Sequence, residues 1–303
     1  MWELTSDDCL FLALSPAVAL AFGAVCSAFM YADLHGLPAF LPKLKKVQPK
    51  PLPTREDYAG LLSVVLGQNL CISFFLLPPL TLMLYRLLGV QVSSPSLPQL
   101  VLEFVLIGAA YDTWFTVCHR VFHTPSFYHL HKRHHTWKAP CAFEGGYFDA
   151  LDFILGNYGP MLWIPPFITR HFFTILLFGV LGALSVAVSH SGYNFESTLW
   201  FLGPIKPTVR HDAHHEFFNV NYSHFGFWDW LFGTLAIGED DAAKRRAAGA
   251  KAVAVVEADG SKADAKAAPG SGDGGARQRA GGGGGGRGPR SSSPGARAPR
   301  GGG

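Results

Sequence analysis

Long apolar stretches alternate with short polar ones along most of this chain. A helix that crosses a bilayer needs roughly 20 mostly apolar residues, and three stretches meet that length while two come close to it. The last two are separated by a short polar turn just after Pro165 and Pro166, which predicts a hairpin of two helices. The pattern therefore predicts five apolar helices, over residues 10–31, 59–88, 97–118, 151–168 and 172–188.

The second apolar stretch contains residues that interrupt an ordinary spanning helix. Gln68 and Asn69 are polar positions inside it, and the adjacent Pro78 and Pro79 lack the backbone N–H that an α-helix uses. Membrane helices tolerate proline where neighbouring groups satisfy the freed carbonyls. We therefore expect a kink or a break towards the far end of this stretch.

The overall composition agrees with a membrane protein. Of the 303 residues, 49% are hydrophobic and 16% are charged, which is more apolar and less charged than an average soluble domain. The first stretch has no basic segment before it and exceeds the usual apolar length of a secretory signal, so we expect a retained membrane helix. The predicted fold class is an all-α, multi-pass integral membrane protein with a histidine-rich helical cap on its cytosolic side and a disordered tail.

The distribution of charge orients the predicted helices. Residues 41–55 contain four lysines and one arginine with no acidic residue, and the positive-inside rule places such a loop in the cytosol. The second and third helices then return the chain to the cytosol near residue 119, where further basic residues follow. Because a hairpin leaves and re-enters on the same face, all histidine clusters are predicted on the cytosolic side.

The chain divides into three regions by composition. Residues 1–96 form a predicted membrane anchor with a basic loop, and residues 97–238 hold the histidine-rich region with the hairpin. Residues 239–303 are rich in Ala, Gly and Arg and nearly lack large apolar side chains, which predicts a disordered tail. The five cysteines are scattered without a C-x-x-C pair, so neither a disulfide framework nor a thiolate metal site is indicated.

Histidines occur in four short motifs between residues 119 and 215. The motifs read HRVFH, HKRHH, HSGYN and HDAHH, in that order. Residues three or four positions apart share a helical face, so these spacings bring imidazoles together. At the histidine frequency of this chain, one H-x-x-H-H motif is expected by chance about 0.02 times, and two occur. The nine candidate metal ligands are His119, His123, His131, His134, His135, His190, His211, His214 and His215.

So many imidazoles predict more than one bound ion. A structural zinc ion needs only four ligands, whereas nine neutral imidazoles suffice for two ions, and imidazole binds iron, zinc, copper and nickel. Carboxylates near the rings help to balance the charge and to fix each imidazole tautomer. The available acids are Asp112, Glu144, Asp149, Asp152 and Asp212, and we expect Asp112, Asp212 and Glu144 in that role. His129 and His224 are possible additional ligands, whereas His35 and His171 are expected to be structural.

These motifs carry a resemblance to a known superfamily. The four histidine motifs, followed by NYSHFGFWDWLFGT, resemble the fatty acid hydroxylase and sterol desaturase superfamily of membrane di-iron oxygenases over residues 97–234. HSGYNF with HDAHH and WDWLFGT is most similar to the branch of cholesterol 25-hydroxylases and C4-methylsterol oxidases. This chain departs from that pattern at Gly145 and Gly146, where relatives have bulkier residues, and this difference concerns the identity of the substrate.

The resemblance implies an enzyme of the endoplasmic reticulum membrane. It implies two non-haem iron ions on the nine histidines, O2 as co-substrate, and hydroxylation of a lipid, with a sterol favoured over a fatty acyl chain. It also implies electrons from a separate donor such as cytochrome b5 and its reductase. No protein general base is required, so no catalytic residue is expected beyond the metal ligands, and no nucleic-acid partner is expected.

Other functions remain open at this level. A sterol or fatty acyl desaturase uses a similar metal centre, and the spacing of histidines does not separate the two reactions. A haem carrier favours single histidines facing each other within paired spans, and a transporter favours polar residues along the spans. The histidines here follow the ends of the spans, which disfavours both classes. A membrane protein that binds metal without oxidising a substrate is the remaining alternative.

Overall fold

The structure is a bundle of helices that runs through most of the chain. The computed structural model describes residues 4–36, 46–48, 52–194 and 207–236, and within them it contains no β-strand beyond two isolated bridges. The predicted all-α fold is confirmed. The predicted tail at residues 239–303 lies outside the described residues. The helical elements are α1 (Ser6–His35), α2 (Arg55–Val64), η1 (Val65–Asn69), η2 (Ile72–Leu76), α3 (Leu77–Leu88), α4 (Leu97–Phe122), α5 (Tyr128–His131), η3 (His134–Thr136), η4 (Ala142–Gly146), α6 (Ala150–Asp152), η5 (Phe153–Asn157), α7 (Tyr158–Trp163), η6 (Pro165–Phe167), α8 (Phe172–His190), α9 (Pro207–Phe217) and α10 (Phe227–Leu231).

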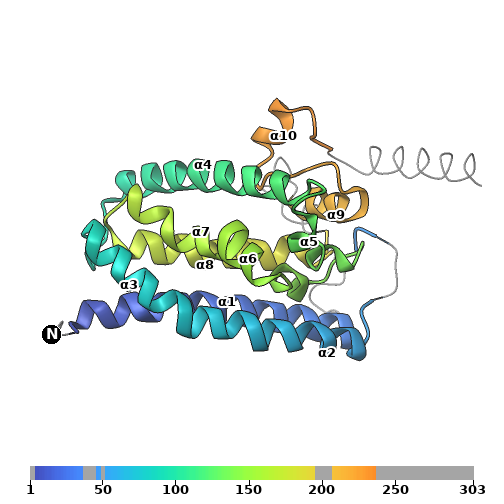
Figure 1. Ribbon diagram of the computed structural model, residues 1–303, viewed down its shortest axis with the longest axis horizontal. Coiled ribbons are helices and arrows are strands. Elements are labelled where there is room, and N and C mark those ends of the chain that lie inside the picture. Colours follow the sequence, from blue (N-terminus) through green and yellow to red (C-terminus); the bar gives the residue numbers. More distant parts are fainter. Residues whose placement is uncertain (1–3, 37–45, 49–51, 195–206, 237–303) are drawn as a thin grey trace, which may run out of the picture. The chain divides into compact units, whose positions relative to one another are not determined.

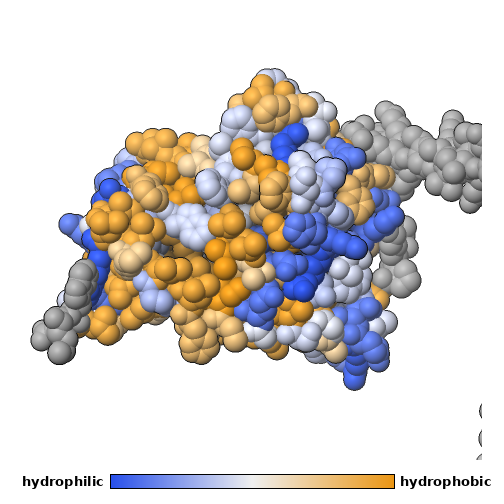
Figure 2. All heavy atoms as spheres, in the orientation of Figure 1, coloured by the Kyte–Doolittle hydropathy of each residue, from blue (hydrophilic) through white to orange (hydrophobic). Residues whose placement is uncertain are grey.

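Four helical runs are long and apolar enough to cross a membrane. They are Ser6–His35, Arg55–Leu88, Leu97–Phe122 and Phe172–His190, which correspond to four of the five predicted apolar helices. Large hydrophobic side chains along α1, α3 and α4 are exposed, and Figure 2 shows them covering much of the visible face. Hydrophilic side chains gather in the same view at the end that carries α5.

The prediction of a fifth spanning helix over residues 151–168 was wrong. This segment is divided into α6, the π-helical η5, α7 and the 3-10 turn η6, and α7 ends at Trp163. Pro165 and Pro166 follow immediately, and they cannot donate the hydrogen bonds that would extend the helix. The short helical run nevertheless packs against α8, so the hairpin exists with one arm too short to span a bilayer.

The second run is helical throughout residues 55–88, so the break that was predicted as one alternative does not occur. Its hydrogen bonding changes to the wider π-helical pattern at η1 and η2, and Pro78 and Pro79 occupy the first turn of α3. Proline fits the first turn of a helix because the N–H groups there have no partner within the helix. A π-helical stretch inside an α-helix often marks a functional region, and η1 contains Asn69, one of the polar residues noted in the sequence.

The helices pack in three layers, with α4 on one side, α7 and α8 in the middle, and α1 with α2 and α3 on the other side (Figure 1). Leu14 and Val18 of α1 and Ile175 of α8 are fully buried in the core between the layers. Threonine caps set where two helices begin, because Thr5 and Thr54 each form a capping box with an aspartate three residues later. The starting points of α1 and α2 are thus set by the local sequence.

The ends of α1, α4 and α8 and the start of α2 meet at one end of the bundle (Figure 1). The Asp33 carboxylate of α1 accepts hydrogen bonds from the Tyr58 and Tyr193 hydroxyls at 2.6 Å and 2.8 Å. Lys46 Nζ lies 2.9 Å from the same carboxylate. Lys46 comes from the basic segment of the sequence, and it lies with the carboxyl ends of α1 and α8 at the same end of the bundle as the histidines.

Candidate metal centre

Nine histidines converge at this end of the bundle, and they are the nine that the motifs single out. Their ring nitrogens form two groups, and within each group the potential ligand atoms lie within 4.8 Å of one another. The five-histidine group consists of His119, His123, His131, His135 and His214. The four-histidine group consists of His134, His190, His211 and His215.

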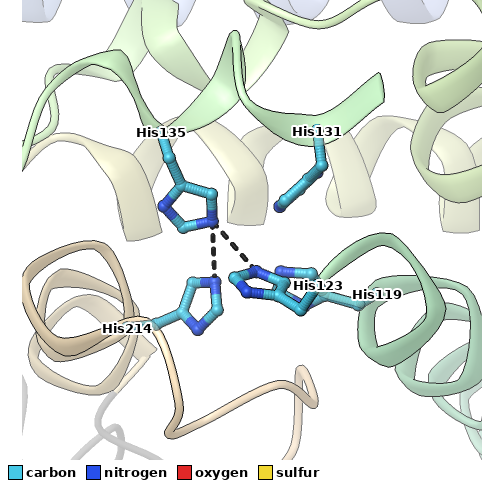
Figure 3. Close-up of side chains that lie close together, drawn as sticks. All are labelled: His119, His123, His131, His135 and His214. Atoms are coloured by element: carbon cyan, nitrogen blue, oxygen red, sulfur yellow. Dashed lines mark hydrogen bonds between the residues drawn. The ribbon is translucent and has the colours of Figure 1, made fainter. Parts of the chain in front are cut away.

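Helical spacing explains most of the membership of each group. His119 and His123 are four residues apart at the end of α4, and His131 and His135 are four apart around α5; both pairs point into the five-histidine group (Figure 3). His211 and His215 are four apart on α9 and belong together in the other group. In each H-x-x-H-H motif the middle histidine, His134 or His214, points into the opposite group, so the two motifs link the two groups.

Six of the nine rings are oriented by a hydrogen bond at Nδ1. In five of them Nδ1 faces a backbone carbonyl oxygen, and a carbonyl only accepts hydrogen bonds, so Nδ1 must carry the proton. His131 Nδ1 instead faces the Asp152 carboxylate at 2.6 Å. The carbonyl partners are Tyr222 for His119, Glu144 for His134, Val186 for His190, Val220 for His214 and Trp137 for His215.

This orientation leaves the Nε2 lone pairs pointing at one another. His134 Nε2 and His190 Nε2 lie 3.2 Å apart, and neither can donate because each ring carries its proton at Nδ1. The Nε2 atoms of His119 and His131 are buried without any hydrogen-bond partner. A buried acceptor without a donor costs free energy, and facing lone pairs repel. A cation at the centre of each group would give the buried Nε2 atoms a partner and remove the repulsion between the facing lone pairs. The residues are therefore suited to holding metal ions.

Burial keeps the imidazoles in the form that binds metal. Removal from water lowers the pKa of His123 to about 2, and the neighbouring His119 ring adds to the effect. Burial likewise holds the pKa values of His131 and His214 well below the usual range. A metal ligand must be unprotonated, so these neutral rings are prepared for a cation at neutral pH.

The carboxylate closest to a ring is one that the sequence prediction did not select. Asp152 belongs to the start of the broken apolar segment, is buried, and holds His131 Nδ1. A carboxylate that accepts from a metal-binding histidine fixes its tautomer and makes it a stronger ligand. The signal available in the sequence was an acidic residue beginning an apolar stretch, close after the second motif.

The three acids that were predicted near the rings have different roles. Glu144 Oε1 accepts the Trp137 backbone N–H at 3.0 Å and lies 4.0 Å from His215 Nδ1. Asp212 Oδ1 accepts a hydrogen bond from Gln48 Nε2 at 2.7 Å. Asp112 accepts the backbone N–H groups of His224 and Phe225, which begin the aromatic segment, residues 224–232. Among the described residues, no hydrogen bond joins Asp112 to a histidine ring.

The remaining histidines lie outside both groups. His129 is exposed, and His224 stacks on the Phe115 ring at a centroid distance of 4.6 Å. Neither residue joins a cluster of potential ligands among the described residues. His171 faces Glu103 at 2.8 Å, and the His35 ring contacts a tyrosine of its own helix; both were expected to be structural residues.

A second buried acid, Asp229 of α10, holds the segment whose carbonyls orient two of the rings. Its carboxylate accepts the backbone N–H groups of Tyr222 and Ser223, both at 2.8 Å, and it faces Arg210 of α9 at 3.4 Å. The Tyr222 carbonyl in turn orients His119. Sequence reasoning missed this link because it passes through backbone groups rather than through a ligand motif.

Comparison with known proteins gives a consistent result for this region. The sequence profile described as fatty acid hydroxylase matches residues 104–234. A fatty acid hydroxylase of Mycosarcoma maydis is 30% identical over 251 residues, which cover 78% of this chain and 63% of that protein. A methylsterol monooxygenase of Aspergillus fumigatus is 32% identical over 169 residues, which cover 54% of this chain and 56% of that protein.

A third relative matches over more of its own length. The C-4 methylsterol oxidase of Schizosaccharomyces pombe is 30% identical over 217 residues, which cover 67% of this chain and 70% of that protein. The chain spans less than two thirds of the first two relatives. No solved structure matches the chain at a significant level.

Proposed function

Because the chain belongs to the fatty acid hydroxylase family, we propose that it is a membrane-bound monooxygenase that hydroxylates a lipid, with a sterol as the favoured substrate. The observation that carries this proposal is the convergence of nine neutral imidazoles in two adjacent groups, with their lone pairs directed inwards. The five-histidine group is assigned to one ion and the four-histidine group to a second ion. Iron is the proposed metal, and when bound, the iron pair would pass electrons to O2 and supply the oxidising power towards a C–H bond.

The protein residues have three tasks in this proposal. Backbone carbonyls and Asp152 hold the rings so that each Nε2 faces a metal position. Burial keeps water away from the centre, since His134, His214 and seven other ligand candidates are buried or half-buried. Asp152 offsets part of the positive charge that neutral imidazoles leave uncompensated. Orientation, exclusion of water and charge balance are therefore all supplied by residues of this chain.

The reaction consumes electrons that must come from outside the chain. Hydroxylation places one oxygen atom of O2 in the C–H bond and reduces the other to water, with two electrons and two protons. We assign the electrons to a separate donor such as cytochrome b5 and its reductase. Lys132, within the second motif, and Lys138, just after it, are exposed, and a basic surface suits an acidic protein partner. By the positive-inside rule this end faces the cytosol, and the proposed location is the endoplasmic reticulum.

The proposal is tested by comparing the lipids of cells that express the wild type, His134→Ala or His129→Ala. His134 belongs to the four-histidine group, whereas His129 is exposed and lies outside both groups. We expect a hydroxylated lipid with the wild type and with His129→Ala, and none with His134→Ala. Identical profiles in all three, with O2 and reductant supplied, would contradict the proposal. A new double bond without a hydroxyl would assign the chain to the desaturases instead.

A further inference from the structure

An apolar cavity of about 530 Å³ lies between the N-terminal helices and the middle layer of the bundle. This volume falls within the ~300–1,000 Å³ typical of ligand pockets. One wall is formed by α1, including Phe22 and Ala24, and the facing wall by the run from α2 to η2, including Leu66. Residues of η4, η5, α7 and α8 complete the lining.

The lining defines the chemistry of a molecule that could occupy the cavity. Within the described part of the chain, none of the lining residues is charged, and most are aliphatic or aromatic. An ionised carboxylate or phosphate buried here would have no partner and would be strongly disfavoured. The few polar side chains include Asn69, whose amide is engaged because its Nδ2 donates to the Gly146 carbonyl. The cavity therefore suits an uncharged, mainly apolar molecule.

The outer side of the cavity faces the bilayer. Leu20 of α1 and Leu66 of η1 line it from opposite walls and are 60% and 53% exposed. Both belong to runs that are long and apolar enough to span a membrane, so their exposed surfaces face lipid. The change to π-helical hydrogen bonding occurs on this wall, at η1. A lipid can thus reach the cavity sideways, without leaving the membrane.

The inner end of the cavity adjoins the four-histidine group. Gly145 and Val186 both line the cavity, and a Cβ atom at Gly145 would lie 3.0 Å from His190 Nδ1. The absence of a side chain at Gly145 therefore lets the wall of the cavity approach the His190 ring. The adjacent Gly146 is tied to η1 through Asn69, so the lipid-facing wall and the metal centre are directly connected.

We propose that this cavity binds the lipid substrate, that an uncharged lipid enters it from the bilayer between α1 and η1, and that its bound end is presented to the four-histidine group. This inference rests on the proposed oxidation of a lipid and adds where and by which residues the lipid is selected. The walls formed by α1 and by the run from α2 to η2 precede residue 104, where the family match begins. The selecting residues therefore lie largely outside the stretch that the family profile matches.

A matched pair of alanines on α1 tests the inference. Ala24 and Ala28 are both exposed and lie four residues apart, but only Ala24 lines the cavity. Wild type, Ala24→Phe and Ala28→Phe are purified as full chains in lipid nanodiscs and labelled with a sterol that carries a photoreactive diazirine. We expect labelled peptides from α1 and residues 59–76, with labelling reduced about fivefold or more in Ala24→Phe and unchanged in Ala28→Phe. Leu66→Trp, from the facing wall, is expected to reproduce the loss.

Metal content and product formation are measured on the same samples. Equal metal content in all variants shows that a loss of labelling comes from the filled cavity rather than from misfolding. Equal labelling of the two alanine variants, or labelling confined to the groove between α4 and α10 at Phe104, Phe225 and Trp228, would overturn the inference. Ala24→Phe oxidising lipid at the wild-type rate would also overturn it while leaving the oxidation intact. The expected labelling with no oxidised lipid from the wild type would support the cavity and contradict the proposed function.

Discussion

The two histidine groups use the same kind of ligand, yet their surroundings differ. In the five-histidine group, His131 donates to a carboxylate, Asp152, at 2.6 Å. In the four-histidine group, the Nδ1 atoms of His134, His190 and His215 face backbone carbonyls, and the Glu144 carboxylate is 4.0 Å from His215 Nδ1. The group with fewer ligands also lies against the apolar cavity, through Gly145 and His190.

This difference predicts different roles for the two proposed metal positions. More ligands and a charged partner favour tight retention of an ion, whereas four ligands leave room for exchangeable positions. An ion that meets O2 or substrate needs such open positions. We therefore assign retention mainly to the five-histidine group and contact with the substrate to the four-histidine group.

Removing one ligand from either group is expected to have the largest effect. His211→Ala and His123→Ala should each reduce the metal content from two ions per chain to about one, because the other group retains its ligands. Both variants should lose product formation, since the proposed reaction needs the pair. Inductively coupled plasma mass spectrometry and lipid analysis measure the two outcomes, and His129→Ala serves as the control. A variant with one ion and undiminished activity would refute the two-ion mechanism.

Asp152→Asn is expected to weaken metal binding in the five-histidine group by about 10-fold to 100-fold. The substitution preserves shape but removes the negative charge and disturbs the tautomer of His131, whose Nδ1 it contacts. Competition with a chelator of known affinity measures the change. Weaker binding of both ions to the same extent would show that the two groups act as one site rather than as two.

Glu144→Gln should have a smaller effect, about threefold or less on metal affinity. Glu144 is farther from a ring than Asp152, and His215 Nδ1 already faces the Trp137 carbonyl at 3.2 Å. The same chelator titration provides the measurement. An effect as large as that of Asp152→Asn would remove the contrast between the charge environments of the two groups.

The convergence of the nine histidines could be predicted from the sequence because the spacing within each motif is local. Pairs such as His119 with His123 share one helical face whatever the rest of the fold does, so their convergence could be expected from the motifs alone. The division into five and four could not be predicted, because it depends on contacts between motifs. The His134 ring of η3 faces His190 and His215, and His214 of α9 faces His135. The hydrogen-bond partners of the rings could not be predicted either, because most of them are backbone carbonyls, and every residue has one.

The membrane helices were predictable from hydropathy, with one informative failure. Many of residues 151–168 are buried against neighbouring helices, including α8. An apolar run that is partly buried in protein resembles a spanning helix in a hydropathy pattern. Pro165 and Pro166 ended the helix near Trp163. The carboxylate of Asp152, at the start of this run, was underestimated for the same reason, since the run was interpreted as membrane rather than as part of the site.

Asp112→Asn is expected to have the smallest effect of the series. Asp112 accepts the backbone N–H groups of His224 and Phe225, and an asparagine oxygen can still accept them without the charge. The expected loss of stability is about 1 kcal/mol, seen as a small decrease in apparent Tm. Metal content should not change, because Asp112 holds the aromatic segment rather than a ring. A loss of metal from Asp112→Asn would place it beside the ligands after all.

The central claim is that the two histidine groups each hold one iron ion, and the metal-to-chain ratio tests it most directly. The full chain is purified without chelators from cells supplied with iron and measured by inductively coupled plasma mass spectrometry against quantitative amino-acid analysis. The account predicts two iron ions per chain. Fewer than one iron ion per chain, or zinc as the predominant metal, would contradict it.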